Sequence, residues 1–289
     1  MTFTAVARCP RTGRLGVGMA TRAPAVGNRC PVVVPMFGAA SVQLIADPRL
    51  TQLCGRLMQT GYSAAKVLAE LQASDKHILR RQIGIVDAYG NTAAYSGPTE
   101  GSYSGHVEGR QWVAMGNAVV SEAVVKAMAE ALEKSESEEI WDRLMLAVEA
   151  GGKAGGQKEG QRSAALLVFG AEPYALVDLR VDFHPEPIGE LRRIYDWFRP
   201  LIPYSRIDIN SFVRVANSAM RCSSARVREE LICAKRASLG TVVLDEAIDF
   251  DELGGDIAGT TVHVALAYSL RVFVCVSGVA RFFAGPGQG

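Results

Sequence analysis

Short apolar β-type segments occur in pairs along this sequence, and a tight turn joins the members of a pair. Residues 3–8 and 15–21 flank Pro10-Arg11-Thr12-Gly13, and residues 81–86 and 92–96 flank Tyr89-Gly90-Asn91. Such turns are typical of antiparallel hairpins, because a parallel pair needs a long crossover connection. The pattern therefore favours antiparallel sheets over the rival interpretation, a doubly wound parallel sheet.

Segments with helical periodicity separate these strand pairs. Ser63 is placed to cap one helix, and Pro187 stands in the first turn of another. The predicted helices cover residues 50–61, 63–71, 121–132, 139–149 and 187–198. Further strands are predicted at 32–34, 39–45, 111–115, 163–169 and 174–181, with glycine-rich loops at 101–109 and 151–160. Two sheets packed face to face, with paired helices outside, would bury every apolar face, so we expect an α+β fold, a four-layer αββα sandwich.

The character of the chain changes after Pro203, since Lys235 is the only lysine beyond it. We therefore divide the chain into a domain at 1–203 and a C-terminal extension at 204–289. Within the extension we expect a helix at 226–237 and a solvated acidic loop at 245–256. The apolar stretch 262–283 carries Arg271 at its centre, which costs about 2.5–3.5 kcal/mol in a membrane, so it predicts two buried strands rather than a membrane helix.

Composition excludes several classes of protein. The 31 basic and 30 acidic side chains give a net charge of +1, so nothing favours nucleic acid or an anionic membrane as a partner. The six cysteines are far apart and form no Cys-x-x-Cys motif, which indicates reduced thiols in a cytoplasmic protein. The four histidines share no metal-ligand spacing, so no metal site is predicted.

Two glycine motifs have ordinary explanations. Gly16-Val17-Gly18 lacks the third glycine of a dinucleotide fingerprint and lies in a predicted strand. Gly151-Gly152-Lys153 follows a helix, whereas a phosphate-binding loop follows a strand, so it indicates a flexible loop whose lysines could face a substrate. A Gly-x-Ser-x-Gly nucleophile elbow is absent from the sequence.

The start of the chain suggests a specific chemistry. Thr2 follows the initiator Met, and Thr is small enough for aminopeptidases to remove that Met. Removal would place a hydroxyl and a free α-amine, with an ordinary pKa of about 7.7–8.0, on one residue. The amine can then act as general base for its own hydroxyl. A Thr at position 2 is common by chance, but the predicted αββα layering is the architecture of N-terminal nucleophile (Ntn) hydrolases.

The sequence resembles the bacterial domain-of-unknown-function family 1028, which is classed as Ntn-hydrolase-like. The resemblance covers roughly residues 1–200 and implies an αββα fold with amidohydrolase chemistry. Two positions depart from the family pattern: Cys9 stands where Asp is usual, and Phe183 replaces an Asp before His184. The motifs that carry it are Met1-Thr2-Phe3, Val6-Ala7-Arg8, Pro10 with Thr12-Gly13, Leu15-Gly16-Val17, Ala25-Val26-Gly27, Arg81-Gln82, Gly84, Val86-Asp87, Gly105-His106, Gly116-Asn117, residues 161–168 and residues 178–182.

If the mechanism of Ntn hydrolases applies to this sequence, five residues have specific roles. Thr2 is the nucleophile, Asn117 an oxyanion donor and Ser163 a hydrogen-bond partner of the terminal amine. Arg22 and His106 are candidates for binding a substrate carboxylate. The ordinary alternatives are an Asn in a turn, a strand-edge Ser, a solvated Arg and a loop His.

Two functions remain open at this point. One is an amidohydrolase that cleaves a small peptide-like or acylated substrate without metal or organic cofactor. The other is a non-catalytic binding or structural protein with the same fold. Exposed apolar helix faces would suit a homodimer. Retention of Met1, or an apolar wall around Thr2, would favour the second function.

Overall fold

The computed structural model describes residues 1–202, 260–266 and 272–278. The chain divides into two compact units, Met1–Ile207 and Asp208–Gly289. In the second unit the structure describes one antiparallel pair, β11 (Thr260–Leu266) and β12 (Val272–Gly278), so strands occupy the stretch predicted to hold two. The predicted helix at 226–237 and acidic loop at 245–256 lie outside the described residues. Within the described part of the chain, no helix is long and apolar enough to cross a membrane.

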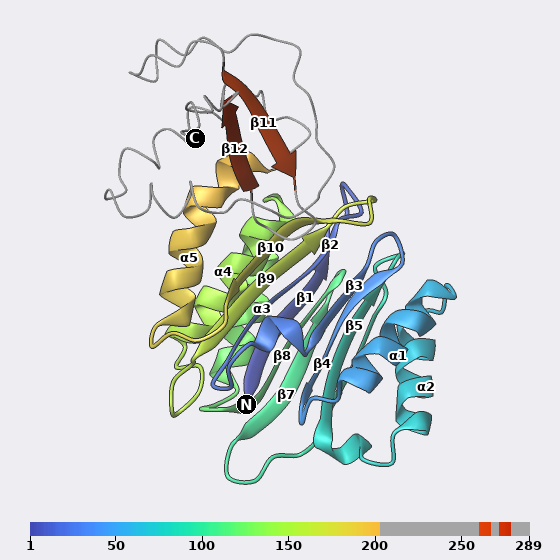
Figure 1. The fold of residues 1–289 in the computed structure, drawn as a ribbon. Helices are drawn as coiled ribbons and strands as arrows, with labels where there is room; N and C mark the ends of the chain where they lie inside the picture. The colour runs from blue at the N-terminus through green and yellow to red at the C-terminus, as the bar shows by residue number, and fades with distance from the viewer. Residues whose placement is uncertain (203–259, 267–271, 279–289) are drawn as a thin grey trace, which may run out of the picture. The chain divides into compact units, whose positions relative to one another are not determined.

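The first unit contains a six-stranded sheet with the first strand near its middle (Figure 1). The strand order is β10-β9-β2-β1-β8-β7, and every neighbouring pair is antiparallel. The antiparallel prediction is therefore confirmed, and the parallel rival is wrong. The strands are β1 (Thr2–Arg8), β2 (Leu15–Thr21), β7 (Tyr103–Gly109), β8 (Trp112–Val119), β9 (Ser163–Phe169) and β10 (Ala175–Val181).

A second, four-stranded sheet carries two helices on its outer face. Its antiparallel strands are β3 (Pro31–Val34), β4 (Gly38–Leu44), β5 (Arg81–Asp87) and β6 (Thr92–Ser96), in that order. The helices are α1 (Pro48–Gln59) and α2 (Ala64–Ser74), with the short 3-10 segments η1 (Val26–Asn28) and η2 (Ile78–Arg80) nearby in sequence. The Ser63 hydroxyl accepts from the Lys66 N–H and caps α2, as predicted.

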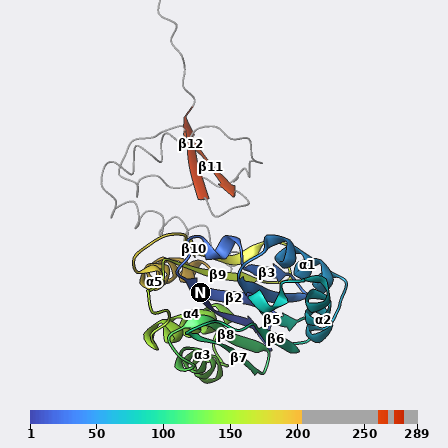
Figure 2. The ribbon, with the colours of Figure 1, turned by 90° about the horizontal axis from the view of Figure 1, so that it is seen from below.

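Three helices cover the six-stranded sheet. They are α3 (Ala123–Lys134), α4 (Ile140–Lys153) and α5 (Pro187–Phe198), which the 3-10 segment η3 (Arg199–Leu201) follows. Helix α4 packs on β1, β2 and β9, and α5 packs on β9 and β10. A Cβ at Gly16 would lie 2.7 Å from Leu144 Cδ1 and one at Gly18 3.0 Å from the Leu144 carbonyl oxygen, so these glycines of β2 allow α4 to approach closely. The first unit thus has the order helices, sheet, sheet, helices (Figure 2).

The space between the two sheets contains an apolar cluster. Its members come from both sheets and from the segment 26–30, and they include Val6, Val17, Met19, Val86 and Val113. A separate apolar cluster joins the four-stranded sheet to α1 and α2. Since side chains alternate along a strand, Thr2 and Thr4 project from the same face of β1 as Val6, toward the second sheet.

Two sequence predictions need correction. Residues 101–109 were expected to be a loop, but Tyr103–Gly109 form β7, the edge strand of the six-stranded sheet. Helix α4 extends to Lys153, which shortens the predicted loop at 151–160.

Candidate active site

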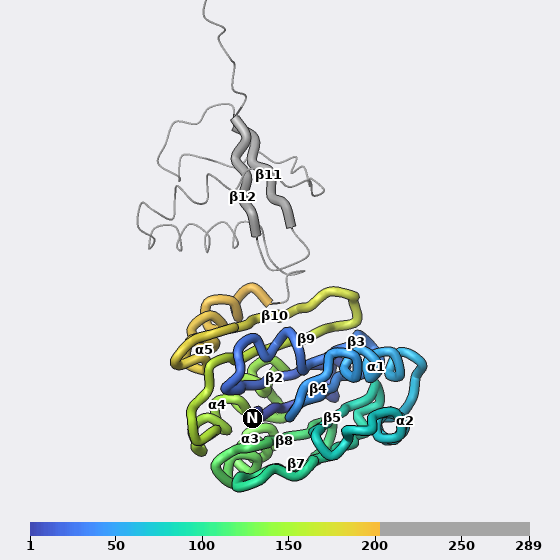
Figure 3. The backbone as a smooth tube through the Cα atoms, turned by 60° about the horizontal axis from the view of Figure 1, so that its bottom comes forward, coloured from blue at the N-terminus to red at the C-terminus, as the bar shows by residue number. Residues whose placement is uncertain are grey.

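Five polar residues form one row across the end of the six-stranded sheet where β1 begins. Thr2 lies directly opposite Thr21 of β2 and Asn117 of β8. The row continues with Ser163 beyond Thr21 and with Ser104 beyond Asn117. Directly opposed residues of antiparallel strands project from the same face, so these side chains all face the second sheet. Figure 3 marks the N-terminus, at which β1 begins, next to β2 and β8. The row brings Thr2, Asn117 and Ser163 of the predicted site to one end of the sheet.

The Thr2 hydroxyl is buried and hydrogen-bonded. Thr2 is 5% exposed, and its Oγ1 lies 3.0 Å from Thr21 Oγ1. The Thr21 hydroxyl donates its proton to the Met1 carbonyl oxygen. Because that proton is used, the Thr2 hydroxyl is the donor to Thr21 Oγ1. Sequence reasoning missed Thr21, although the predicted hairpin already places residue 21 opposite residue 2.

The surroundings of the N-terminal amine favour its neutral form. Burial lowers the pKa of the Met1 α-amine from its ordinary value of 8.0, because the ammonium loses solvation. The nearby Cys30 acts in the opposite direction and raises that pKa, but burial is the larger cause. Burial also raises the pKa of the Cys30 thiol to about 11, so that thiol is uncharged at neutral pH.

A buried network of side-chain amides lies beside Thr2. Gln82 Nε2 is within 2.8 Å of Ser96 Oγ, 3.0 Å of the Gly105 carbonyl oxygen and 2.9 Å of the Gly116 carbonyl oxygen. Gln82 Oε1 accepts from Gln43 Nε2 and from Asn117 Nδ2, each at 2.8 Å.

The network extends beyond Gln82 in two directions. Gln43 Oε1 accepts from the hydroxyls of Thr4 at 2.6 Å and Ser41 at 3.1 Å. On the other side, Ser96 Oγ lies 2.9 Å from His106 Nδ1. His106 is therefore a strand residue tied to the network, and the prediction that it lies in a loop is wrong. Its proposed contact with a substrate carboxylate stays a prediction.

Ser163 and Arg22 have other partners in the structure. The Ser163 hydroxyl donates to the Ala23 carbonyl oxygen at 2.6 Å and accepts from the Val26 N–H at 3.1 Å. It thereby fixes the segment that follows β2, and its predicted bond to the terminal amine stays a prediction. Arg22 is exposed and forms an ion pair with Glu159, which is also exposed. A substrate carboxylate would have to compete with Glu159.

The loop between α4 and β9 flanks the start of β1 on both sides. The Val120 N–H, just beyond β8, donates to the Gly156 carbonyl oxygen at 3.0 Å, and the Arg162 N–H donates to the Thr21 carbonyl oxygen at 2.7 Å. Gln157 in this loop is 2% exposed, and both polar atoms of its side chain have no hydrogen-bond partner among the described residues. A buried orphan amide is costly, so Gln157 is a second residue that sequence reasoning missed.

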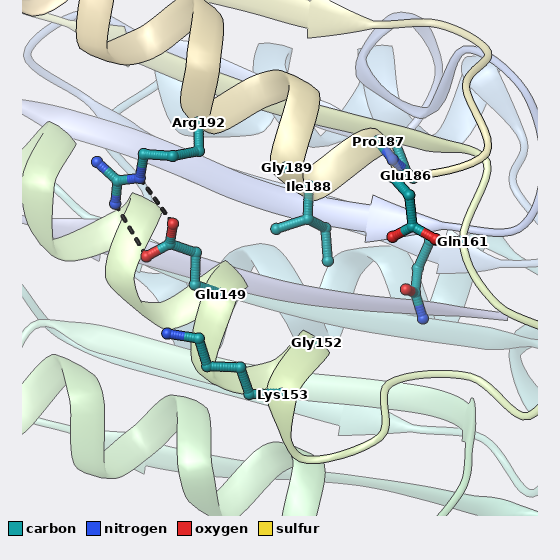
Figure 4. Close-up of a pocket in the computed structure, with 9 residues that line it drawn as sticks. All are labelled: Glu149, Gly152, Lys153, Gln161, Glu186, Pro187, Ile188, Gly189 and Arg192. Carbon is teal, nitrogen blue, oxygen red and sulfur yellow. Dashed lines mark hydrogen bonds and ion pairs between the residues drawn. The ribbon is translucent and has the colours of Figure 1, made fainter.

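A separate cavity of about 320 Å³ lies between the C-terminal end of α4 and the start of α5 (Figure 4). Lys153 lines it, together with an ion pair in which Arg192 donates to Glu149 at 2.6 and 2.9 Å. None of the five predicted site residues lines this cavity. Among the described residues, no group of three or more His, Cys, Asp and Glu could hold a metal ion.

The two departures from the family pattern lie at opposite ends of the six-stranded sheet: Cys9 lies at the end remote from Thr2, and Phe183 lies just beyond β10 at the end that carries Ser163. Cys9 follows the last residue of β1 and is seven residues beyond Thr2. Because seven residues of extended chain span about 23 Å, Cys9 lies at the far end of the strand from Thr2. The thiol of Cys9 is free and buried. Phe183 is 70% exposed just beyond β10. The Cys9 departure therefore does not change the Thr2 row.

Comparison with protein families identifies the chain. Residues 2–191 match the sequence model described as "Family of unknown function (DUF1028)". The chain belongs to the DUF1028 family. The match begins at Thr2, the first residue of β1.

A solved structure of a DUF1028 protein agrees with this assignment. Protein SPO2555 from Silicibacter pomeroyi, a DUF1028 protein, is similar at 28% identity and a TM-score of 0.62, over 68% of this chain and 85% of that one. Anbu (ancestral beta-subunit) from Yersinia bercovieri matches at 10% identity and a TM-score of 0.35, over 71% and 97% of the two chains. BPH from Thiobacillus denitrificans matches at 13% identity and a TM-score of 0.30, over 59% and 99%. No curated protein matches the sequence.

Proposed function

We propose that this DUF1028 protein is an amidohydrolase of the Ntn type, with an αββα fold and Thr2 as its nucleophile after removal of Met1. The observation that carries the proposal is the position of Thr2: the first residue of a central strand, with a buried hydroxyl bonded to Thr21 and buried amides alongside. An enzyme of this type needs one residue to supply both nucleophile and base, and only the first residue of a chain carries a free α-amine.

The reaction proceeds in two stages. The neutral Thr2 amine accepts the hydroxyl proton while Oγ1 forms a bond to the carbonyl carbon of the substrate amide. The amine then returns the proton to the leaving nitrogen as the C–N bond breaks, which leaves an ester on Thr2. The same amine accepts a proton from water as the water oxygen attacks the ester. That proton passes to Thr2 Oγ1 when the acid product leaves.

The surroundings support this chemistry in two ways. Burial lowers the pKa of the Met1 α-amine, and Thr2 is the more buried of the two residues, so desolvation should also favour a neutral Thr2 amine, which is the form that accepts a proton. Asn117 Nδ2 commits one N–H to Gln82, and its second N–H can donate to the oxyanion. Because the amine supplies the base, the reaction needs no metal or organic cofactor. The substrate is a small peptide-like or acylated molecule, for which Arg22 and His106 are the proposed carboxylate contacts, and a homodimer is the proposed assembly.

The competing proposal is a binding or structural protein of the same fold without turnover. Its specific support is the Thr21 hydroxyl, which donates to the Met1 carbonyl and so contributes to holding Met1 in place. The two proposals differ in the first residue of the purified protein.

Intact-mass measurement and β-lactone labelling test the proposal. We expect a chain that lacks Met1 and one lactone adduct on Thr2. Thr2→Ala should reduce the labelling rate by at least about 10³-fold, whereas Thr2→Ser should keep part of it. Thr4→Val is the matched control, because Thr4 is a buried hydroxyl on the same face of β1, bonded to Gln43 rather than near the amine. A retained Met1, or an adduct on another residue, would favour the binding protein.

A further inference from the structure

The orientation of the Gln82 amide is fixed by the backbone. Two of the three atoms that face Gln82 Nε2 are the carbonyl oxygens of Gly105 and Gly116. Carbonyl oxygens only accept, so the nitrogen of the amide must face them and the oxygen must face the other way. Gln82 is fully buried, so water cannot replace these partners. Gln82 Oε1 is therefore a fixed acceptor that faces Gln43 and Asn117.

This fixed acceptor determines the orientation of the Asn117 amide. Asn117 must direct its nitrogen toward Gln82 Oε1, at 2.8 Å, which leaves Oδ1 on the other side of the amide. Asn117 is fully buried, and its Oδ1 has no hydrogen-bond partner in the described part of the protein. An acceptor buried in this way destabilises the folded protein unless a donor reaches it.

A donor that satisfies Asn117 Oδ1 has to come from a group beside Asn117. Its directly opposed neighbour on β1 is Thr2. While Met1 is attached, the Thr2 nitrogen is a peptide N–H, but removal of Met1 gives it two or three N–H bonds. We infer that Asn117 Oδ1 accepts a hydrogen bond from the Thr2 α-amine, and that Gln82 is the positioning residue that holds Asn117 in this orientation. This inference rests on the proposed function, because it requires Thr2 to be the first residue.

The hydrogen bond would orient the base. A neutral amine that donates one N–H to Asn117 Oδ1 can turn its lone pair toward its own hydroxyl proton. The same acceptor stabilises the ammonium and so opposes the effect of burial on the amine pKa. Asn117 thus keeps the amine from becoming too weak a base.

Few charged groups face this amine. The segment from η1 to β3 brings Arg29 and Cys30, and Cys30 is uncharged at neutral pH. The residue after β2 is Arg22, which is paired with Glu159 of the loop between α4 and β9. The side chains that β4, β5 and β8 direct toward this end of the space are amides and hydroxyls, such as Gln43, Gln82 and Asn117. Helices α3 and α4 pack on the opposite face of β1.

The pKa of the Thr2 amine tests the inference. A chain that begins at Thr2 is prepared by cleaving a fusion directly before Thr2, and competitive acetylation with acetic anhydride over a pH series gives the amine pKa. Asn117→Asp should raise that pKa by about one unit or more, because a carboxylate replaces the neutral acceptor. Asn117→Leu should lower the pKa of the Thr2 amine, and Gln82→Met should lower it as well.

Gln43→Met is the matched control. Gln43 belongs to the same network and bonds Gln82, but it does not touch Asn117. Its replacement should leave the amine pKa unchanged if orientation by Gln82 is what matters. An unchanged pKa in both Asn117 variants would overturn the inference, and so would a Gln43→Met shift as large as that of Gln82→Met. If Gln82→Met does not fold, the two Asn117 variants still decide it.

The inference and the proposed function can fail separately. A native protein that retains Met1 or does not react with the β-lactone contradicts the proposed function. The amine pKa is measured in a chain that starts at Thr2 by design, so it reports on Asn117 whether or not the protein turns over a substrate.

Discussion

Between the same two sheets, β1 directs Thr2 and Thr4 toward one end and Val6 toward the other, and different forces stabilise the two ends. The apolar end is a cluster of aliphatic side chains around Leu15, Val17 and Val113. The polar end is a chain of directional hydrogen bonds that runs from Thr4 through Gln43 and Gln82. Apolar contacts adapt to small shifts, whereas an amide network fixes the orientation of each member. The comparison indicates that one end stabilises the fold and the other positions a few polar atoms.

The apolar end should carry the larger share of stability. Leu15 is 1% exposed and lies at the end of β2 that is remote from Thr21. Leu15→Ala should lower the free energy of unfolding by about 2–5 kcal/mol, because a cavity replaces the lost side-chain contacts. Denaturant unfolding measures this change, and β-lactone labelling of Thr2 should persist in the folded variant. Lost labelling in a folded variant would show that the two ends are not independent.

Cys30 belongs to the apolar cluster and also lies near the N-terminal amine, so it tests the boundary between the two ends. Burial raises the pKa of its thiol from 9.0 to about 11. Between these pH values the unfolded chain loses the proton and the folded chain keeps it, so the free energy of unfolding should fall as pH rises. The fall is at most about 1.4 kcal/mol per pH unit.

Unfolding curves between pH 8 and about 11 measure this effect. Cys30→Ala should flatten the pH dependence relative to the parent protein. Burial also raises the pKa of the Cys54 thiol, to about 12. Its contribution to the fall in the free energy of unfolding is similar in parent and variant, so it cancels when the two are compared. If the free energy of unfolding changes equally with pH in parent and variant, the pKa of the Cys30 thiol is not raised by folding, and the thiol must be in contact with water.

The polar end should contribute less to stability. Gln43→Leu removes the acceptor of the Thr4 and Ser41 hydroxyls and should cost about 1–3 kcal/mol. Gln157→Leu makes the same exchange at a buried amide that has no partners in the described chain, so it should be neutral or stabilising. Chemical denaturation of the two variants separates a satisfied amide from an orphan one. Equal losses would contradict this distinction.

The smallest effect is expected outside the inter-sheet space. Arg22 and Glu159 are about half exposed, so Arg22→Ala should change the free energy of unfolding by only about 0–1 kcal/mol. If Arg22 binds a substrate carboxylate, the variant should instead show a higher KM with little change in kcat. Thermal melting and steady-state kinetics measure the two quantities, and Glu159→Gln is the matched control for loss of the ion pair.

Local patterns predicted most of the first unit. The turn at 10–13 and the apolar runs beside it predicted the β1–β2 hairpin, and the strand 163–169 was predicted with the bounds observed for β9. Strand β7 was missed because Gly105 and Gly109 lower the strand propensity of the segment. The Tyr103 and Trp112 rings occupy the space where Cβ atoms of these glycines would lie, so tertiary contacts decide the conformation there.

The candidate site was less accessible to sequence reasoning. Thr2 and Asn117 were predicted, and the hairpin register could have added Thr21. The amide network could not be foreseen, because Gln43 and Gln82 are 39 positions apart and meet only when β4 pairs with β5. The polar residues that interrupt each of these apolar strands, Gln43 and Gln82 among them, were the only available signal. The position of Gln157 follows from the path of a loop, which no periodicity encodes.

The location of β1 between β2 and β8 has a consequence during synthesis. Thr2 becomes buried only when residue 117 is available to pair with it. At about 5–20 residues per second, a ribosome needs about 6–23 seconds to produce that much chain. An aminopeptidase that removes Met1 therefore has its best access to the Met1–Thr2 bond while the chain is still emerging. Protein that is synthesised faster than Met1 is removed would fold with Met1 still attached at the end of β1, and the ratio of the two species would then record the rate of synthesis.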